Sequence, residues 1–284
     1  MSATQNRPAN RRREEARAAA ERLRAEQARA ARRSRTIAIS VLVACLVLFG
    51  AVVAVILVSG DDGDDAAGGA VPSLDEVSAP AGATGDGAIP VGAAGVAGST
   101  EGADPDAVVV SVYADYMCPF CGRFEEINAA TLAEMREAGD VVVEYHPVSI
   151  LDRLSSGTQY STRAATAAAL VADRSPEAFV AFNDVMFVDQ PAENSEGLTD
   201  AQIADLAAGA GAAQAVVDAI ADGSYLTGPD SFAPWVAALT GRAGEDLDQL
   251  ATPAILVDGE PLDTDEYDWS QPGRLADAIE AARG

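Results

Sequence analysis

Two cysteines with two residues between them are the part of this sequence best suited to chemistry. They form the segment Cys118-Pro119-Phe120-Cys121, and the chain has one other cysteine, Cys45. Thiols at this spacing can close a small disulfide ring and reopen it, so the pair could carry out thiol–disulfide exchange, in which a thiolate is the nucleophile. Cys45 lies in a long apolar run and is interpreted as an apolar side chain, with lipidation or an intermolecular disulfide as alternatives.

The sequence around the pair predicts that a strand gives way to a helix there. Residues 107–113 are an almost unbroken β-branched run, as expected for a strand buried on both faces. Residues 119–138 predict a helix that Gly139 closes. Cys118 would then lie at the helix N-terminus, where unpaired N–H groups and the positive end of the helix dipole favour a thiolate. Pro119 in the first turn fixes the entry φ and loses no needed hydrogen bond.

The order of the elements predicts an α/β fold. Residues 141–146 form a second β-branched run, so residues 107–146 should make a βαβ unit with parallel strands. Residues 158–250 are rich in Ala and helical in pattern, which predicts an all-helical insertion.

Short elements complete the predicted domain at its two ends. Residues 88–91 predict an edge strand, where Pro90 is tolerated. Near the other end, two apolar segments flank the dipeptide Asp258-Gly259, a pattern typical of a β-hairpin. A last helix is expected to begin at residue 270 or 271 and to end at residue 283.

Two other roles for the cysteine pair are less consistent with the sequence. A structural zinc site needs two more ligands, and the chain offers only one histidine, His146, besides carboxylates. An inert structural disulfide would close a loop so short that it constrains little chain entropy. We therefore expect a redox pair with no metal and no cofactor. His146 is interpreted as structural, and Trp235 either lines an apolar substrate groove together with Phe120 or belongs to the core.

An uncharged apolar stretch, Thr36 to Val58, divides the charge along the chain. Residues 1–35 hold 11 arginines and 4 glutamates, whereas the whole chain carries a net charge of −25. About 23 helical residues span a hydrocarbon core of roughly 30 Å, so the stretch predicts a single transmembrane signal anchor. It is too long for a cleaved signal peptide. The Arg-rich side should stay cytoplasmic, which places the rest of the chain outside the cytoplasm at the cell membrane.

The predicted organisation has four parts. They are a cytoplasmic Arg-rich tail over residues 1–35, a transmembrane helix over 36–58, a flexible acidic linker rich in Gly and Ala over 59–87, and a folded domain over 88–284 that contains the helical insertion of about 158–250. The acidic balance of the folded part excludes nucleic acid as a partner, because phosphates require compensating Lys or Arg.

The stretch VVVSVYADYMCPFCGRF resembles the DsbA-like branch of the thioredoxin superfamily, in the membrane-anchored form found in actinobacteria. The resemblance covers residues 88–284, and a helical insertion fits this branch better than plain thioredoxin. A second motif, Thr252-Pro253, agrees with it. The resemblance implies a cis proline at Pro253 packed against the cysteine pair, with Thr252 offering backbone groups to an extended substrate.

The sequence departs from that family pattern at three places. Phe120 replaces a histidine that stabilises the thiolate in strong oxidants, so a less oxidising pair is expected. Val112 stands where many relatives carry a buried acid thought to assist proton transfer. Asp115 matches a common family position and is expected to be exposed. Together with Glu125 and Glu126 it should place negative charge near the thiolate and oppose its formation.

The sequence therefore predicts an extracytoplasmic thiol–disulfide oxidoreductase in which Cys118 is the nucleophile and Cys121 the resolving thiol. Its expected substrates are unfolded or reduced secreted and envelope proteins, into which it introduces disulfides. The resemblance implies a quinone-linked membrane partner, of the DsbB or vitamin-K-epoxide-reductase type, that reoxidises the pair. The alternatives are a reductase or isomerase of the same fold, and a redox-sensing or binding protein without turnover.

Overall fold

The computed structural model describes residues 71–247 and 250–284. The predicted cytoplasmic tail, the apolar stretch 36–58 and most of the predicted linker lie outside the described residues. Among the helices that the structure does describe, none combines the length and apolar character needed to cross a membrane. The account below concerns the domain that begins near residue 70.

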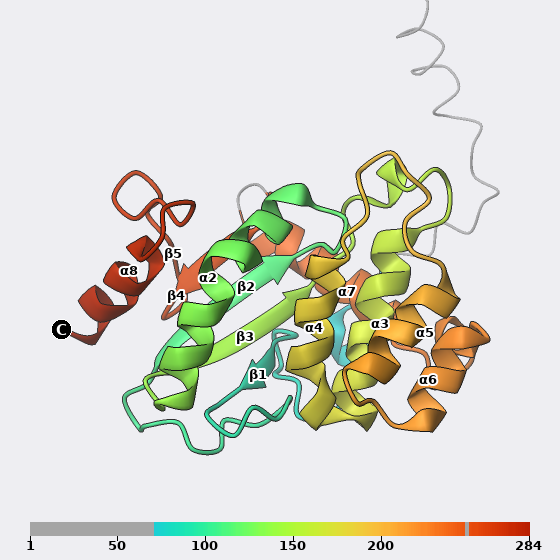
Figure 1. The fold of residues 1–284 in the computed structure, drawn as a ribbon, viewed down its shortest axis with the longest axis horizontal. Helices are drawn as coiled ribbons and strands as arrows, with labels where there is room; N and C mark the ends of the chain where they lie inside the picture. The colour runs from blue at the N-terminus through green and yellow to red at the C-terminus, as the bar shows by residue number, and fades with distance from the viewer. Residues whose placement is uncertain (1–70, 248–249) are drawn as a thin grey trace, which may run out of the picture. The chain divides into compact units, whose positions relative to one another are not determined.

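A five-stranded sheet forms the centre of the domain (Figure 1), with the order β1-β3-β2-β4-β5. Its strands are β1 (Ile89–Val91), β2 (Val108–Ala114), β3 (Val141–Pro147), β4 (Ala254–Val257) and β5 (Glu260–Pro261). Only β2 and β3 pair in parallel, as expected for a βαβ unit, and the other pairs are antiparallel. Pro90 lies in the edge strand β1, where its missing N–H costs no ladder hydrogen bond. Asp258 and Gly259 both have positive φ in the β4–β5 turn, as a tight hairpin requires.

The helices fall into two groups, those of the connection between β3 and β4 and the pair formed by α2 and α8. The connection between β3 and β4 is helical, as predicted, and Figure 1 shows its helices gathered beside the sheet, away from α8. The helices are α2 (Pro119–Glu137), α3 (Tyr160–Arg174), α4 (Phe179–Val188), α5 (Asp200–Gly209), α6 (Gln214–Ala221), α7 (Ala233–Asp246) and α8 (Arg274–Arg283). The last helix begins later than predicted. Asp268 first accepts hydrogen bonds from Ser270 in a turn, and Gly273 then adopts a φ of 85°, which a right-handed helix does not allow.

Two apolar clusters hold the sheet between its covering helices. On one face, alternate residues of the strands, such as Val110 and Val143, pack with Phe124 of α2 and Leu275 of α8. The other cluster lies mainly among the helices of the insertion, around the fully buried Trp235. Because β2 and β3 are buried between helices, they are rich in β-branched residues instead of alternating in polarity.

The domain starts earlier than the sequence predicted. Residues 71–87, assigned above to the flexible linker, lie against α3 and α7. The backbone N–H of Ala81 donates to Asp173 at the end of α3, and the short 3₁₀ turn Leu74–Glu76 contacts α7. Gly87 has a φ of 86°, and a Cβ added there would lie 2.8 Å from Leu239 Cδ1. Leu74 and Val77 are separated by two acidic residues, which is too brief an apolar signal to stand out within a Gly- and Ala-rich stretch.

Replacement of Gly87 tests whether this segment belongs to the folded unit. Gly87→Ala should lower the free energy of unfolding by about 2 kcal/mol, because the left-handed backbone and the clash with α7 both oppose a Cβ. Gly211→Ala is the matched control: its φ is 90° but its Cβ would meet nothing, so about 1 kcal/mol is expected. Urea unfolding of both variants measures the difference, and equal costs would contradict the packing of residues 71–87.

Candidate active site

The two thiols lie at the start of α2, where the strand β2 ends. Cys118 is the N-cap residue with extended backbone angles, and Pro119 is the first residue of the helix. The Cys118 N–H donates to the Asp115 carbonyl at 2.9 Å, and its own carbonyl accepts from the Cys121 N–H at 3.0 Å. Both cysteines are buried, at 5% and 0% exposure, and both are free thiols, so the structure shows the reduced pair.

Besides the start of α2, the loop before β4 also lines the site. The Thr252–Pro253 peptide bond is cis. The Cys118 sulfur lies 3.2 Å from the Thr252 carbonyl oxygen, to which it donates in its protonated form, although the two residues are 134 positions apart. The pairing of β4 with β2 accounts for this contact, because it places Ala254 opposite Tyr113, near the end of the strand that leads to the cysteines.

The two thiols have opposite acidities. A hydrogen bond from the Cys121 thiol does most to lower the pKa of Cys118, and burial works against it. Further hydrogen bonds from the Thr252 side chain and from the N–H groups of Cys121 and Phe120 also lower the pKa. The pKa of Cys118 is thereby lowered to about 6, from about 8.5 for a free cysteine. Burial, followed by the neighbouring Cys118, raises the pKa of Cys121 well above its usual value. Cys118 is therefore a thiolate at neutral pH, while Cys121 keeps its proton.

The expectation that Asp115 is exposed is wrong, since its exposure is 0%. Its carboxylate accepts four hydrogen bonds of 2.7–2.9 Å, from the backbone N–H groups of Met117, Ile150 and Leu151 and from the Ser161 hydroxyl. Burial raises the pKa of Asp115, and these hydrogen bonds oppose the rise. Instead of acting on solvent or substrate, the carboxylate joins the segment before Cys118 to the loop after β3 and to α3.

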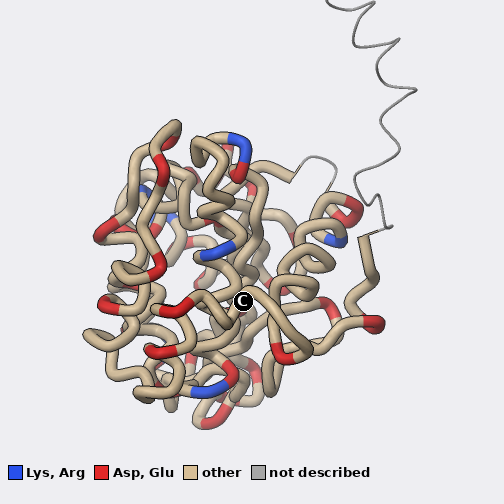
Figure 2. Tube along the Cα trace, turned by 90° about the vertical axis from the view of Figure 1, so that its right-hand side faces the viewer, with Lys and Arg blue, Asp and Glu red and all other residues tan. Residues whose placement is uncertain are grey.

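The predicted acidic surroundings of the thiolate are weaker than the sequence suggests. Burial, and then the charge of Asp184, raise the pKa of Glu125 to about 7, so this carboxyl is partly neutral. Glu126 forms an exposed ion pair with Arg123 at 2.7 Å. Figure 2 shows acidic residues spread over the whole described domain instead of collected at one place. The hydrogen bonds at the helix start therefore outweigh the nearby carboxylates at Cys118.

A glutamine that the sequence analysis missed also supports the loop. The Gln190 side-chain amide donates to the Cys118 carbonyl at 2.9 Å and to the Tyr116 carbonyl at 3.1 Å. Gly122 leaves room for it, because a Cβ at that position would lie 2.4 Å from the Gln190 amide oxygen. Gln190 follows α4 in the helical insertion, and no sequence pattern linked it to the cysteines.

A partly apolar groove runs beside the pair between α2 and α4. Its lining includes Pro119, Phe187, Val188 and Gln190. Phe120 projects from the first turn of α2 at 65% exposure, and Val188 is 81% exposed. Trp235, considered above for such a groove, is fully buried in the core instead. Val112, which stands where many relatives carry a buried acid, is buried in β2 and packs in the same apolar cluster as Phe124 of α2.

A fold and a site of this kind define a thioredoxin-like thiol–disulfide oxidoreductase. The Thioredoxin_4 family model, described as thioredoxin, matches residues 98–273. The chain belongs to this thioredoxin family. It is an enzyme of thiol–disulfide exchange and is similar to the DsbA-like proteins of actinobacteria.

Three solved structures illustrate the similarity. The reduced disulfide bond oxidoreductase DsbG of Mycobacterium tuberculosis is 33% identical, with a TM-score of 0.54 over 69% of this chain and 88% of that one. DsbA of the same organism is 34% identical, with a TM-score of 0.54 over 69% and 92% of the two chains. MdbA, a thiol-disulfide oxidoreductase of Corynebacterium diphtheriae, shares the fold at 24% identity and a TM-score of 0.53, over 68% and 93% of the chains.

A segment of the chain also resembles part of a signalling protein. Over 121 residues, 41% of this chain, it is 31% identical to the serine/threonine-protein kinase PknE of Mycobacterium tuberculosis. The match spans about a fifth of the length of that curated relative, 21%.

Removal of the Asp115 carboxylate should destabilise the domain. Asp115→Ala leaves three N–H groups without an acceptor, two of them buried, so the free energy of unfolding should fall by about 3 kcal/mol. Asp115→Asn keeps one acceptor oxygen and should lose less. Asp205→Ala, on the exposed side of α5, should change stability by less than about 0.5 kcal/mol. Thermal and urea unfolding compare the three variants, and a cost near that of the control would contradict the supporting role of Asp115.

The acidity of Cys118 predicts a pH profile for alkylation. The rate with iodoacetamide should rise as pH increases through about 6 and level off above it, because the thiolate is the reacting form. Cys121 should react only at much higher pH. Mass spectrometry of tryptic peptides assigns each rate, and Cys118→Ser should abolish the fast reaction. A midpoint near the free-cysteine value of about 8.5 would contradict the hydrogen-bonded thiolate.

Proposed function

We propose that the protein introduces disulfides into unfolded or reduced secreted and cell-envelope proteins outside the cytoplasm. The observation that carries this proposal is the lowered pKa of Cys118, about 6, beside a buried Cys121 of raised pKa. A stabilised Cys118 thiolate stabilises the reduced enzyme, and a more stable reduced form makes the disulfide form a stronger oxidant. This acidity lies between those of thioredoxin, about 7, and DsbA, about 3.5.

The exchange proceeds in two steps. A substrate thiolate attacks Cys118 Sγ of the enzyme disulfide, the bond between the cysteines breaks, and Cys121 leaves and takes up a proton. A second substrate thiolate then attacks the substrate sulfur of the mixed disulfide, and Cys118 leaves as a thiolate. The substrate loses two electrons to the enzyme pair. The low pKa of Cys118 makes it a good leaving group in this second step.

The substrate would lie across the cysteine pair. The exposed Phe120 and Val188 and the groove beside α2 offer apolar surface to an unfolded chain. The backbone of Thr252, next to the Cys118 sulfur, would align an extended segment beside the thiol. These contacts involve backbone and apolar surface, so they suit many unfolded sequences instead of one.

Location and recycling complete the proposal. The Arg-rich N-terminal tail, the uncharged stretch 36–58 and the acidic remainder support a single-pass protein whose domain faces outward. Disulfides persist in that compartment. Because each cycle leaves the pair reduced, an oxidant is required, and a quinone-linked membrane protein of the DsbB or vitamin-K-epoxide-reductase type would supply it.

The kinase similarity favours a second candidate, a redox sensor. A segment like this one occurs within a longer serine/threonine-protein kinase, so the fold suits a sensing part of a signalling protein. In a sensor the thiol state would be read through the Arg-rich tail and no substrate would be turned over. A Cys118→Ser, Cys121→Ser double variant that keeps full cellular activity would favour a binding role over both catalytic and redox-sensing roles.

The redox state of the pair in cells tests the oxidase direction. After acid quenching and thiol alkylation, Cys118 and Cys121 should be mostly oxidised, whereas a reductase or isomerase would be mostly reduced. The purified pair should have a reduction potential between those of thioredoxin, about −270 mV, and DsbA, about −120 mV.

Trapping of mixed disulfides tests whether the pair reacts with substrate proteins. Cys121→Ala should accumulate mixed disulfides through Cys118 on non-reducing gels, and Cys118→Ala, the matched control, should not. A mostly reduced cellular pair with a potential at or below that of thioredoxin would overturn the oxidase assignment. The absence of trapped partners would count against exchange with proteins.

A further inference from the structure

The chain's only histidine has no hydrogen-bond partner although it is buried. His146 lies near the end of β3 with 1% exposure, and neither ring nitrogen forms a hydrogen bond. One face of its ring stacks on Tyr113 of the neighbouring strand, with 3.9 Å between ring centroids and 14° between planes. Buried polar atoms in native proteins are nearly always paired, so the unpaired ring nitrogens call for a partner, of which a bound ion is one kind. The disulfide exchange described above does not use this side chain.

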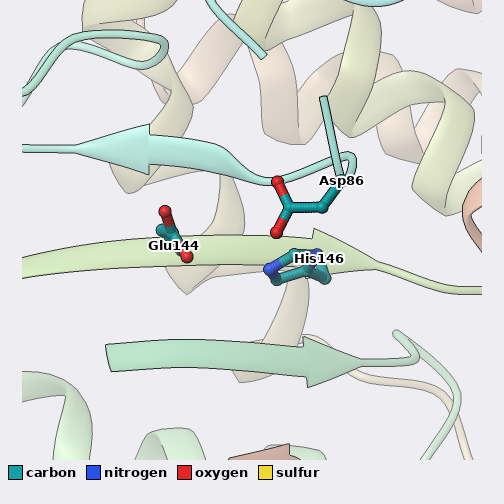
Figure 3. Close-up of side chains that lie close together, drawn as sticks. All are labelled: Asp86, Glu144 and His146. Carbon is teal, nitrogen blue, oxygen red and sulfur yellow. The ribbon is translucent and has the colours of Figure 1, made fainter. Parts of the chain in front are cut away.

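Two carboxylates lie beside the imidazole. Glu144 is two residues earlier on β3 and therefore on the same face of the sheet. Asp86 comes from the turn before β1, which antiparallel pairing with β3 brings alongside. Figure 3 shows a ring nitrogen of His146 facing these carboxylates. One ligand atom from each residue lies within 4.8 Å of the others, and within the described ranges this is the one cluster of three or more such residues.

Hydrogen bonds orient both carboxylates. Ser111 on β2 donates to Glu144 Oε2 at 2.7 Å, which leaves Oε1 available. The Thr84 hydroxyl donates to Asp86 Oδ1, and Thr84 is itself held by the Ala88 N–H at 2.9 Å. Groups that orient metal-binding side chains in this way are typical of metal sites.

The two carboxylates of the cluster are open to ions from solution, whereas His146 is buried. Asp86 and Glu144 line a groove over the sheet together with Asp246 and Arg242 near the end of α7. Arg242 is paired with Asp246, and among the described residues no arginine forms an ion pair with Asp86 or Glu144. Neither ring nitrogen of His146 has a hydrogen-bond partner, so a nitrogen lone pair is free to bind.

We propose that Asp86, Glu144 and His146 bind a divalent transition-metal ion of the Zn²⁺ class, with water completing the coordination. One imidazole nitrogen with two carboxylate oxygens is a donor set suited to Zn²⁺, whereas Mg²⁺ and Ca²⁺ prefer oxygen donors alone. The ion would join the turn before β1 to the end of β3, next to the strand that leads to the cysteines. This site contains neither cysteine and stands apart from the exchange reaction.

The test uses the full chain, purified in detergent without a His tag and with Cys118 and Cys121 oxidised, so that thiols bind no metal. Isothermal titration measures the affinity for Zn²⁺, with Mg²⁺ and Ca²⁺ as comparison ions. Because the chain has one histidine, ¹⁵N NMR of its imidazole reports directly on that ligand. Asp86→Asn and Glu144→Gln remove ligands, and Asp205→Asn on α5 is the matched control.

The expected result is one Zn²⁺ per chain, a shift of the histidine ring ¹⁵N signals, and an affinity at least about tenfold lower in Asp86→Asn and Glu144→Gln. The melting temperature should rise with Zn²⁺ in the unaltered chain and in Asp205→Asn. Unchanged ring signals at saturating Zn²⁺, or equal affinity in all variants, would overturn the proposal. So would binding that appears only after the cysteines are reduced. Asp86 is exposed, so Asp86→Asn remains informative even if Glu144→Gln destabilises the domain.

Discussion

The four hydrogen bonds of the buried Asp115 carboxylate hold together the parts of the protein that meet at the cysteines. Their donors come from the segment before Cys118, from the loop after β3 and from α3. One carboxyl group thereby fixes the end of β2, and the Asp115 carbonyl in turn accepts the Cys118 N–H. The position of the nucleophile at the helix start, and so its acidity, depends on this arrangement.

The sequence could predict the elements whose signals are local. The β-branched runs of β2 and β3, the cysteines at the start of α2 and the Asp258-Gly259 turn all identify themselves within a few residues. The predicted start of α8 is too early, because a turn closed by Asp268 and the left-handed Gly273 delays the helix. The predicted exposure of Asp115 is wrong for another reason. Two of the four donors that enclose its carboxylate belong to Ile150 and Leu151, in a loop distant along the chain. Spacing along the chain does not reveal such a contact.

The same limit applies to charge. Counting acids near Cys118 suggests an unfavourable site for a thiolate. The effect of each acid on the thiolate, however, depends on its burial and on its hydrogen-bond and ion-pair partners. Asp115 is enclosed by donors, Glu126 is paired with Arg123, and Glu125 has a pKa of about 7. What remains at the sulfur of Cys118 is a set of short-range hydrogen bonds. Gln190 reinforces the loop from the helical insertion, so the insertion contributes to the site as well as to the groove beside it.

The long connection between β3 and β4 has a consequence for the newly made protein. Cys118 is synthesised 134 residues before the Thr252 carbonyl that faces its sulfur, and Cys121 follows it closely. Contacts of such separation form late in folding, after local helices and hairpins. A nascent chain that emerges N-terminus first therefore presents its cysteines without their partner loop until almost the whole domain has been made. Its own thiols pass through a stage in which they resemble those of the unfolded proteins proposed above as its substrates.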